Sequence, residues 1–289
     1  MAAVAEAPVI DGLTGMPAPP PRQQSVLHRA WRAFTRNIAI FYALLALLYL
    51  FLPVIVVIVF SFNDNVGRFN SNWQGFTLKS WLDPCGVQGL CPAMVRSLQI
   101  AALSTILATA LGTMIAFAVV RHRFTGRQPT NLLVFLPMAT PEVVLGSSLL
   151  ALFLNLGIST GFGTILIGHV LFNISYVVVT VKARLQGMDS RLEEAAMDLY
   201  ADEWQTFRRV TLPLVTPGII AASLLAFALS FDDFIVANFN AGNTVTFPMF
   251  VWGAAQRGVP PQINVMGTAL FVLAVAALLI GMVAQRRRA

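Results

Sequence analysis

Charged residues are scarce in this sequence. They make up 11% of its 289 residues, whereas hydrophobic residues make up 57%. Soluble proteins are nearer a quarter charged and half apolar. The chain therefore has more apolar surface than a soluble core could hide, which excludes an ordinary soluble domain and predicts a polytopic membrane protein.

Lysine and histidine are also rare. Neither of the two lysines, Lys79 and Lys182, follows a glycine, so the chain lacks the G-x-x-x-x-G-K phosphate-binding loop. His28, His122 and His169 are scattered without metal-ligand spacing. We interpret His169 as a hydrogen-bonded packing residue, with a proton relay as the alternative. We therefore expect no enzymatic activity, no metal and no cofactor in this chain.

The first 26 residues lack the features of a secretory signal. They contain no Lys or Arg before Arg22 and no apolar core, so they do not read as a cleaved signal peptide. They are rich in Ala and Pro and have no helical periodicity. This composition predicts a disordered cytoplasmic tail over residues 1–30, with the membrane domain following over residues 31–289.

What the sequence does contain is six long apolar runs. A helix needs about 20 mainly apolar residues to cross roughly 30 Å of hydrocarbon. The runs predict an all-α fold with six transmembrane helices. We place these spans at about Ile38–Phe62, Ser97–Val120, Asn131–Asn155, Phe162–Val181, Leu214–Asn238 and Val265–Val283.

The basic residues predict the orientation of these spans. Of 19 Lys and Arg residues, Arg68, Lys79, Arg96 and Arg257 fall on one side, which leaves 15 on the other. Cytoplasmic flanks carry the excess of basic residues, so both termini are expected in the cytoplasm. Because the basic residues follow every inner flank rather than cluster on one face, we expect membrane lipid and not nucleic acid as the partner.

A polar segment, about residues 183–213, separates the fourth and fifth runs. The apolar residues that recur in it at helical spacing are Leu192, Ala195, Ala196 and Leu199. Ser190 with Glu193 fits a capping box, so we place the start of a helix near Arg191. The segment therefore begins with a short amphipathic helix.

A second helix start lies later in the same segment. Asp202 is followed three residues on by Gln205, and Pro213 is expected to end this helix before the fifth span. Such a helix pair can be a solvated connector, lie on the membrane surface or dock into a groove of another protein. The mixed charges disfavour the membrane surface, and the connector and docking interpretations both remain open on these grounds.

The stretch EAAMDLYADEWQTFRRVTLPLVTPG resembles the EAA loop of permease subunits in bacterial ABC importers. The family pattern is E-A-A, a glycine four residues after the second alanine, and a later I-x-L-P. The resemblance implies that this loop forms coupling helices that seat in a groove of a separate ATPase, which uses ATP and Mg. The residues assigned to coupling are Glu193, Glu194, Ala195, Ala196, Asp198, Leu199, Tyr200, Ala201, Phe207, Leu212 and Pro213.

One position departs from that pattern. The family's glycine is Tyr200 in this chain. If this position is a left-handed turn between the two helices, a residue other than glycine costs roughly 1–2 kcal/mol there.

Three acidic residues lie inside the apolar runs, where ionisable side chains are costly and are functional candidates by default. Glu142 is about halfway along the third run, beside Pro137 and Pro141, which disturb the helix. Broken helices at membrane depth mainly line cavities, so Glu142 is predicted in a pathway for a cationic substrate. The alternative is a protonated or capped Glu that satisfies freed backbone groups.

Asp232 and Asp233, toward the outer end of the fifth run, either contribute to the pathway or cap a helix.

Three further stretches together resemble a permease subunit of spermidine/putrescine importers. They are FNDNVGRFNSNWQGFTLKSW, SFDDFIVANFNAG and RGVPPQINVMGTALF. The similarity runs from about Asn37 to Ala284. It implies polyamine import across the bacterial cytoplasmic (inner) membrane. The implied partners are a second permease subunit, two copies of an ATPase subunit and an extracytoplasmic substrate-binding protein. Trp73 matches the family's outer-loop Trp, where it either contacts an ammonium group by cation–π interaction or anchors the membrane interface.

Two other functions remain as alternatives. The same machinery could import a different small solute. An ATP-independent channel or carrier is a further alternative, although a carrier would be expected to show an inverted repeat and more intramembrane charges, and the sequence shows neither.

Cysteine is limited to Cys85 and Cys91, both in the first predicted outer loop. Two cysteines at this spacing in an oxidising compartment can close a small disulfide loop, and the alternative is two free thiols.

Overall fold

The structure is a computed structural model that describes residues 26–122 and 124–286. The predicted tail lies outside the described residues, apart from residues 26–30, which are helical. The contacts divide the chain into two units, one ending at Val56 and the other beginning at Val57. Each unit is described by itself.

The first unit consists of most of helix α1 (Val26–Phe60), which contains Pro53. Its portion from Asn37 to Phe60 is long and apolar enough to cross a membrane. None of the side chains described between residues 37 and 56 is buried. Since these side chains are mostly Leu, Ile, Val, Phe and Tyr, this surface suits hydrocarbon rather than water.

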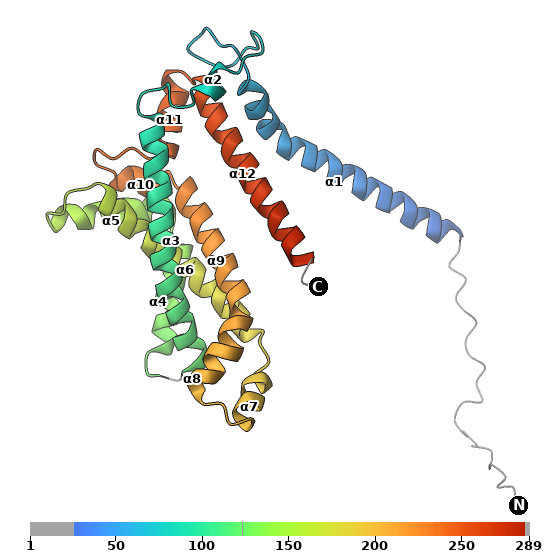
Figure 1. Ribbon diagram of the computed structural model, residues 1–289, viewed down its shortest axis with the longest axis vertical. Coiled ribbons are helices and arrows are strands. Elements are labelled where there is room, and N and C mark those ends of the chain that lie inside the picture. The colour runs from blue at the N-terminus through green and yellow to red at the C-terminus, as the bar shows by residue number, and fades with distance from the viewer. Residues whose placement is uncertain (1–25, 123, 287–289) are drawn as a thin grey trace, which may run out of the picture. The chain divides into compact units, whose positions relative to one another are not determined.

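Three long helices form the centre of the second unit: α3 (Leu90–Arg121), α6 (Phe162–Gln186) and α9 (Leu212–Asp232). They lie side by side in Figure 1. Small residues allow this close packing, because a Cβ added at Gly112 in α3 would lie 2.7 Å from Val177 Cγ1 in α6. The buried residues of this core are Ala108, Ala116, Val177, Val178, Val181, Leu185, Val215, Ala222 and Ala226.

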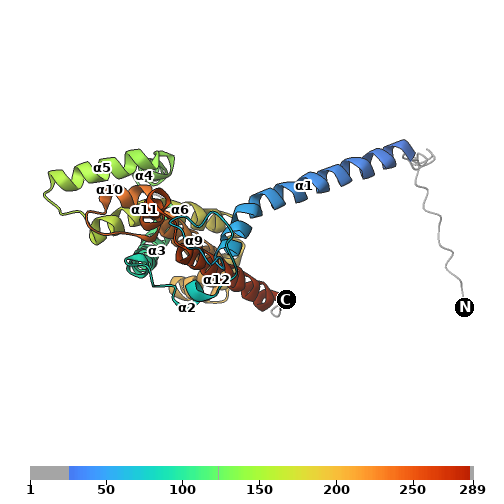
Figure 2. The same cartoon turned by 90° about the horizontal axis from the view of Figure 1, so that it is seen from above.

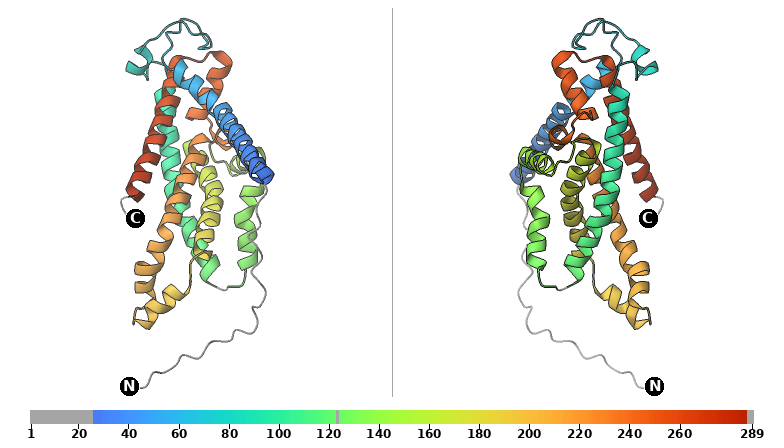
Figure 3. Two further views of the ribbon diagram at one scale, coloured as in Figure 1. Left: turned by 90° about the vertical axis from the view of Figure 1, so that its right-hand side faces the viewer. Right: turned by 90° about the vertical axis from the view of Figure 1, so that its left-hand side faces the viewer.

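The third apolar run forms two helices instead of one straight span. Helices α4 (Arg127–Ala139) and α5 (Glu142–Asn155) are bent by 107° at the break between them, which Figure 3 shows from two sides. Thr140 is extended, as expected for the residue before Pro141. The proline-induced break places Glu142 at the start of α5 rather than inside a continuous helix.

The other elements of the described chain are short, except for the last. They are α2 (Lys79–Leu82), α7 (Arg191–Asp198), α8 (Glu203–Thr206), the π-helical η1 (Phe207–Thr211), α10 (Ile235–Asn240), α11 (Phe247–Arg257) and the long α12 (Pro261–Arg286). In the part that the structure describes, the one β-type pairing is an isolated bridge between Asn63 and Phe76.

The structure has five or six candidate spans, where the sequence predicted six. Five helices are long and apolar enough to cross a membrane, and the bent pair α4–α5 makes a sixth if it counts as one span. The predicted all-α, polytopic membrane fold is therefore confirmed.

The loop before α2 is held by one buried side chain. The Asn63 Nδ2 group donates to Asn70 Oδ1 (2.6 Å) and to the Asn72 carbonyl (2.7 Å), and the Gln74 N–H donates to Asn63 Oδ1 (2.7 Å). Just before and within the first turn of α3, a disulfide joins Cys85 to Cys91. The end of the molecule that carries this loop is thus braced by polar contacts and a covalent bond.

Candidate functional site

A second helix break brings distant acidic residues toward one another. Helix α9 ends at Asp232, and α10 starts after an extended residue, Asp233. Helix α10 lies against α5, as Figure 2 shows from above. The approach is close, since a Cβ added at Gly146 of α5 would lie 3.3 Å from Val236 Cα. Glu142 lies one turn before Gly146, and Asp232 lies one turn before Val236, so the packing of α5 against α10 brings Glu142 and the two aspartates into the same region.

Asp233 is buried and fully engaged. Its carboxylate accepts a hydrogen bond from the Ala237 N–H at 2.8 Å, which caps the first turn of α10, and lies 3.1 Å from His169 Nε2. The Asp233 side chain is 8% exposed and that of His169 is 3% exposed. Asp233 therefore caps α10, and His169 is hydrogen-bonded inside the helix bundle.

The hydrogen bonds continue from His169 into two more helices. Its Nδ1 lies 2.7 Å from Ser230 Oγ in α9, and the Ser104 hydroxyl in α3 donates to the same oxygen at 2.8 Å. With the imidazole proton on Nε2, the ring donates to Asp233 and accepts from Ser230, so every group in the series has a partner. The network joins α3, α6, α9 and the start of α10.

Glu142 and Asp232 differ from Asp233. Glu142, at the break between α4 and α5, and Asp232, at the break between α9 and α10, are both exposed, and neither forms an ion pair with a basic residue in the described part of the chain. Two such carboxylates near one another attract cations. Trp73 does not join this group, because its ring packs edge-on against Phe60 at 6.4 Å in the loop before α2.

The polar segment between α6 and α9 folds as two short helices, α7 and α8. Helix α7 starts at Arg191, but the expected capping box is wrong: the Ser190 side chain makes no capping bond, and Asp189 Oδ1 accepts from the Arg191 N–H at 3.0 Å instead. Helix α8 has the predicted cap, with Asp202 Oδ1 accepting from the Gln205 N–H at 2.7 Å.

Pro213 does not end the second helix, which corrects the expectation from sequence. The chain continues from α8 through η1 into α9 as one helical run from Glu203 to Asp232. Its π-helical turn bonds the Leu212 N–H to the Phe207 carbonyl. Pro213 then enters at the first turn of α9, where the wider turn accommodates its missing N–H.

Tyr200 occupies the turn between α7 and α8 with a φ of 65°. It is the one residue other than glycine with a positive φ in the described chain, and its side chain is 98% exposed. This is the left-handed turn anticipated for the position of the family's glycine.

The residues assigned to coupling divide into two groups. Glu193, Ala196, Ala201, Phe207 and Leu212 are partly buried against the bundle. Those exposed to the surroundings are Glu194, Ala195, Asp198, Leu199, Tyr200 and Pro213. The loop thus has one face toward its own chain and one exposed face.

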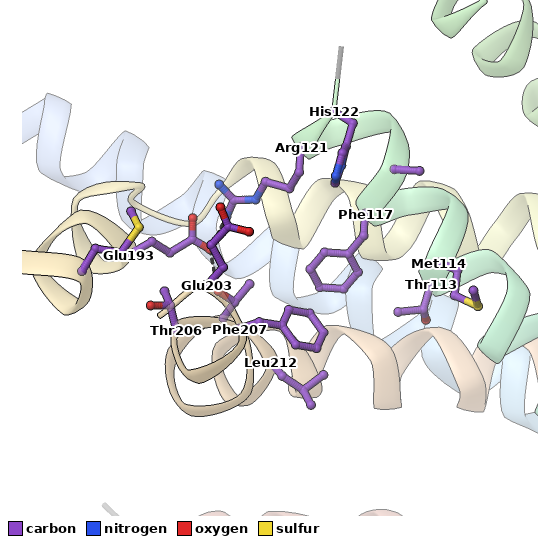
Figure 4. A pocket seen from close by; sticks show the side chains of 13 residues that line it. Thr113, Met114, Phe117, Arg121, His122, Glu193, Glu203, Thr206, Phe207 and Leu212 are labelled. Atoms are coloured by element: carbon purple, nitrogen blue, oxygen red, sulfur yellow. Dashed lines mark hydrogen bonds and ion pairs between the residues drawn. The ribbon is translucent and has the colours of Figure 1, made fainter. Parts of the chain in front are cut away.

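Glu193 has two partners within the chain. The guanidinium of Arg121, at the end of α3, donates to Glu193 Oε1 at 2.8 Å, and the Thr211 hydroxyl donates to the same oxygen at 2.6 Å. Beside these contacts lies a pocket of about 680 Å³ between α3 and the loop, shown in Figure 4. Sequence reasoning treated Arg121 only as a basic flank, because no local pattern relates residues 72 positions apart.

Residues 108–287 match the family described as binding-protein-dependent transport system inner membrane component. The chain belongs to this family. It is a permease subunit of an ABC-type transport system and a multi-pass protein of the inner membrane, as the sequence predicted.

Two relatives of this permease are similar over most of its length. It is 40% identical over 226 residues to the spermidine/putrescine transport system permease protein PotC of Escherichia coli (strain K12), covering 78% of this chain and 85% of that protein. It is 36% identical over 233 residues to the putrescine transport system permease protein PotI of the same strain, covering 78% and 82%. The predicted resemblance to polyamine permeases is confirmed.

A solved structure shares the fold of this permease. A bacterial ABC transporter involved in the import of the acidic polysaccharide alginate matches with a TM-score of 0.61 and 17% identity, covering 89% of this chain and 97% of that chain. At this level of identity the likeness concerns the fold alone.

Proposed function

We propose that this permease carries polyamines and that Glu142 and Asp232 attract the ammonium groups of the substrate. The observation that carries this proposal is the position of two exposed carboxylates at two neighbouring helix breaks, with no ion pair to a basic residue in the described part of the chain. An anionic site of this kind suits a small organic cation. The similarity to PotC and PotI supports the same substrate class.

The exposed face of α7 and α8 is proposed to couple the permease to a separate ATPase that uses ATP and Mg. Exposed apolar side chains at Leu199 (82%), Tyr200 (98%) and Trp204 (66%) support docking, because a solvated connector has no need of them. The other partners are a second permease subunit, a second ATPase copy and an extracytoplasmic binding protein. In this scheme the loop lies in the cytoplasm, and closure of the ATPases moves it to switch access between the two sides.

The test is uptake of labelled spermidine into proteoliposomes that contain the co-expressed complex. Glu142→Gln is expected to lower ATP-dependent uptake by at least about tenfold, since a charge-assisted hydrogen bond contributes about 1.5–3 kcal/mol. Asp64→Asn is the matched control, because Asp64 is an exposed acid paired with Lys79 at 3.3 Å and away from the break. The control is expected to transport like the wild type.

Two comparisons distinguish an error in the assigned residue from an error in the assigned substrate. Equal loss in both variants, or no loss in Glu142→Gln, would remove Glu142 from the pathway. A wild-type complex that hydrolyses ATP but takes up no spermidine would overturn the polyamine assignment and favour another solute.

A further inference from the structure

Helix α3 is not adjacent in the chain to the coupling loop, which comprises residues 183–213 with helices α7 and α8. The loop is continuous with α6 on one side and with α9 on the other, whereas α3 is followed in the chain by α4. A displacement of α7 therefore reaches α6 and α9 through the backbone, but it reaches α3 only through side-chain contacts.

Two such contacts lie on one face of α3. Phe117 packs edge-on against Phe207 with ring centroids 5.4 Å apart, and Arg121, one turn later, pairs with Glu193 at 2.8 Å. Residues four apart on a helix point to the same side. The aromatic contact is apolar and tolerates sliding, whereas the ion pair is directional and fixes the position of α7 relative to α3.

The side chains of the ion pair are partly buried. The Arg121 side chain is 28% exposed and that of Glu193 is 17% exposed. Glu193 also accepts from the Thr211 hydroxyl in η1 at 2.6 Å, so one carboxylate oxygen holds the end of α3, α7 and η1 together. An exposed pair would contribute little, but partial burial and a second hydrogen bond make this one stronger.

The ion pair lies at the edge of a pocket between α3 and the loop. The pocket of about 680 Å³ beside the pair is lined by Met114 and Phe117 from α3 and by Met197 and Leu212 from the loop and α9 (Figure 4). Side chains of α3 and of the loop thus face one another across open space there. The ion pair and the aromatic contact are what bridge that space.

The other part of α3 reaches the acidic site. Ser104 donates to Ser230, which contacts His169, the partner of Asp233. Ser104 and Arg121 are 17 residues apart, or about 25 Å along a helix. A shift at Arg121 would therefore be carried by a rigid helix to the network that caps α10 near Glu142.

We propose that Arg121 is a positioning residue for transport, which through Glu193 ties α3 to the coupling loop and passes its movement to the acidic site. This inference rests on the proposed coupling of the loop to an ATPase. Glu193, in this view, acts on its own chain, and the neighbouring Glu194 faces the partner.

The test is a charge exchange measured on the proteoliposome complex. Arg121→Glu and Glu193→Arg, made singly, are expected to raise the ATP hydrolysed per spermidine transported by about tenfold, as loss of a 1.5–3 kcal/mol contact allows. The double exchange is expected to restore the ratio to within about threefold, because the pair is re-formed with reversed charges and Thr211 can also accept a hydrogen bond.

Arg96→Glu, the same charge change at an exposed site on α3, is the control and is expected to leave the ratio unchanged. No recovery in the double variant, or an unchanged ratio in the single variants, would overturn the proposal.

A second measurement tests the tie without transport or an ATPase. Spin labels at His122→Cys and Met197→Cys, which both line the pocket, report the distance between the end of α3 and α7 in the purified full chain. The native cysteines are disulfide-bonded and are not expected to react. The distance distribution is expected to broaden in Arg121→Glu and to narrow again in the double exchange. An unchanged distribution would refute the tie, whereas failure of spermidine uptake alone would refute only the substrate.

Discussion

Tyr200 shows how a single backbone angle can matter in the coupling loop. Its φ of 65° lies in the left-handed region, which disfavours a residue with a Cβ by about 1–2 kcal/mol. Its ring is 98% exposed and gains no packing within the chain in return. The turn between α7 and α8 is therefore strained, and no packing of the Tyr200 ring within the described chain offsets this strain.

Tyr200→Gly is expected to stabilise the loop in the isolated protein. Relief of the left-handed strain exceeds the greater flexibility of glycine by about 0.5–1 kcal/mol. Trypsin cleavage at Arg191, Arg208 and Arg209 should then slow about twofold to fivefold in detergent, because cleavage follows the population of opened loop. Tyr200→Ala keeps the strain and is the control. Equal protection in both variants would contradict this explanation.

At the scale of elements, helix packing depends on small residues at the contacts. Gly112 is buried where α3 meets α6, and an added Cβ would lie 2.7 Å from Val177 Cγ1 and 3.2 Å from the Ile174 carbonyl. Gly163, at the start of α6, has no atom within 4 Å of such a Cβ. The same substitution therefore has opposite consequences at the two sites.

Gly112→Ala is expected to destabilise the bundle by about 1–3 kcal/mol, because the helices must separate or Val177 must leave its rotamer. Gly163→Ala is expected to be neutral or to stabilise by up to about 1 kcal/mol, since alanine favours a helix. Thermal unfolding midpoints in one detergent compare the two variants. A midpoint for Gly112→Ala at or above that of the wild type would show that α3 and α6 accommodate the added methyl group without loss of stability.

Two predictions about helix ends, both made from local sequence patterns, are wrong. The sequence predicted a stop at Pro213 because proline cannot donate to an α-helical ladder. The π-helical turn at Phe207–Thr211 changes the bonding register just before the proline, so the helix continues into α9. Similarly, Glu193 matched a capping box, but its carboxylate bonds Arg121 and Thr211 instead. The Glu193 carboxylate thus binds side chains from other helices and not the backbone N–H of Ser190.

At the scale of the whole molecule, the exposed ends of the second unit allow its orientation to be tested. Val66, in the loop before α2, is 90% exposed, and Tyr200 is 98% exposed in the coupling loop. The distribution of Lys and Arg predicts that the coupling loop is cytoplasmic and the other loop is outside.

Single cysteines at these two positions are expected to react from opposite sides of the membrane. In right-side-out spheroplasts, a membrane-impermeant maleimide should label Val66→Cys, and Tyr200→Cys should react only after permeabilisation. The paired native cysteines keep the background low. Labelling of Tyr200→Cys in intact spheroplasts would reverse the proposed topology.

The sequence by itself determined the class, the spans and the family of this protein. Apolar runs of about 20 residues have few stable structures other than membrane helices, and the EAA pattern is local enough to be read without a fold. Prolines beside Glu142 also indicated a break, since their effect is on the backbone next to them.

Only the tertiary structure decided which residues meet. It packed α5, which starts at Glu142, against α10, which follows Asp232 and Asp233, and it paired His169 with Asp233 and Arg121 with Glu193. These partners are far apart in the chain, and their contacts depend on how α3, α6 and α9 pack and on the 107° bend between α4 and α5. Local propensity carries no information on such pairings, because they arise from the packing of whole helices.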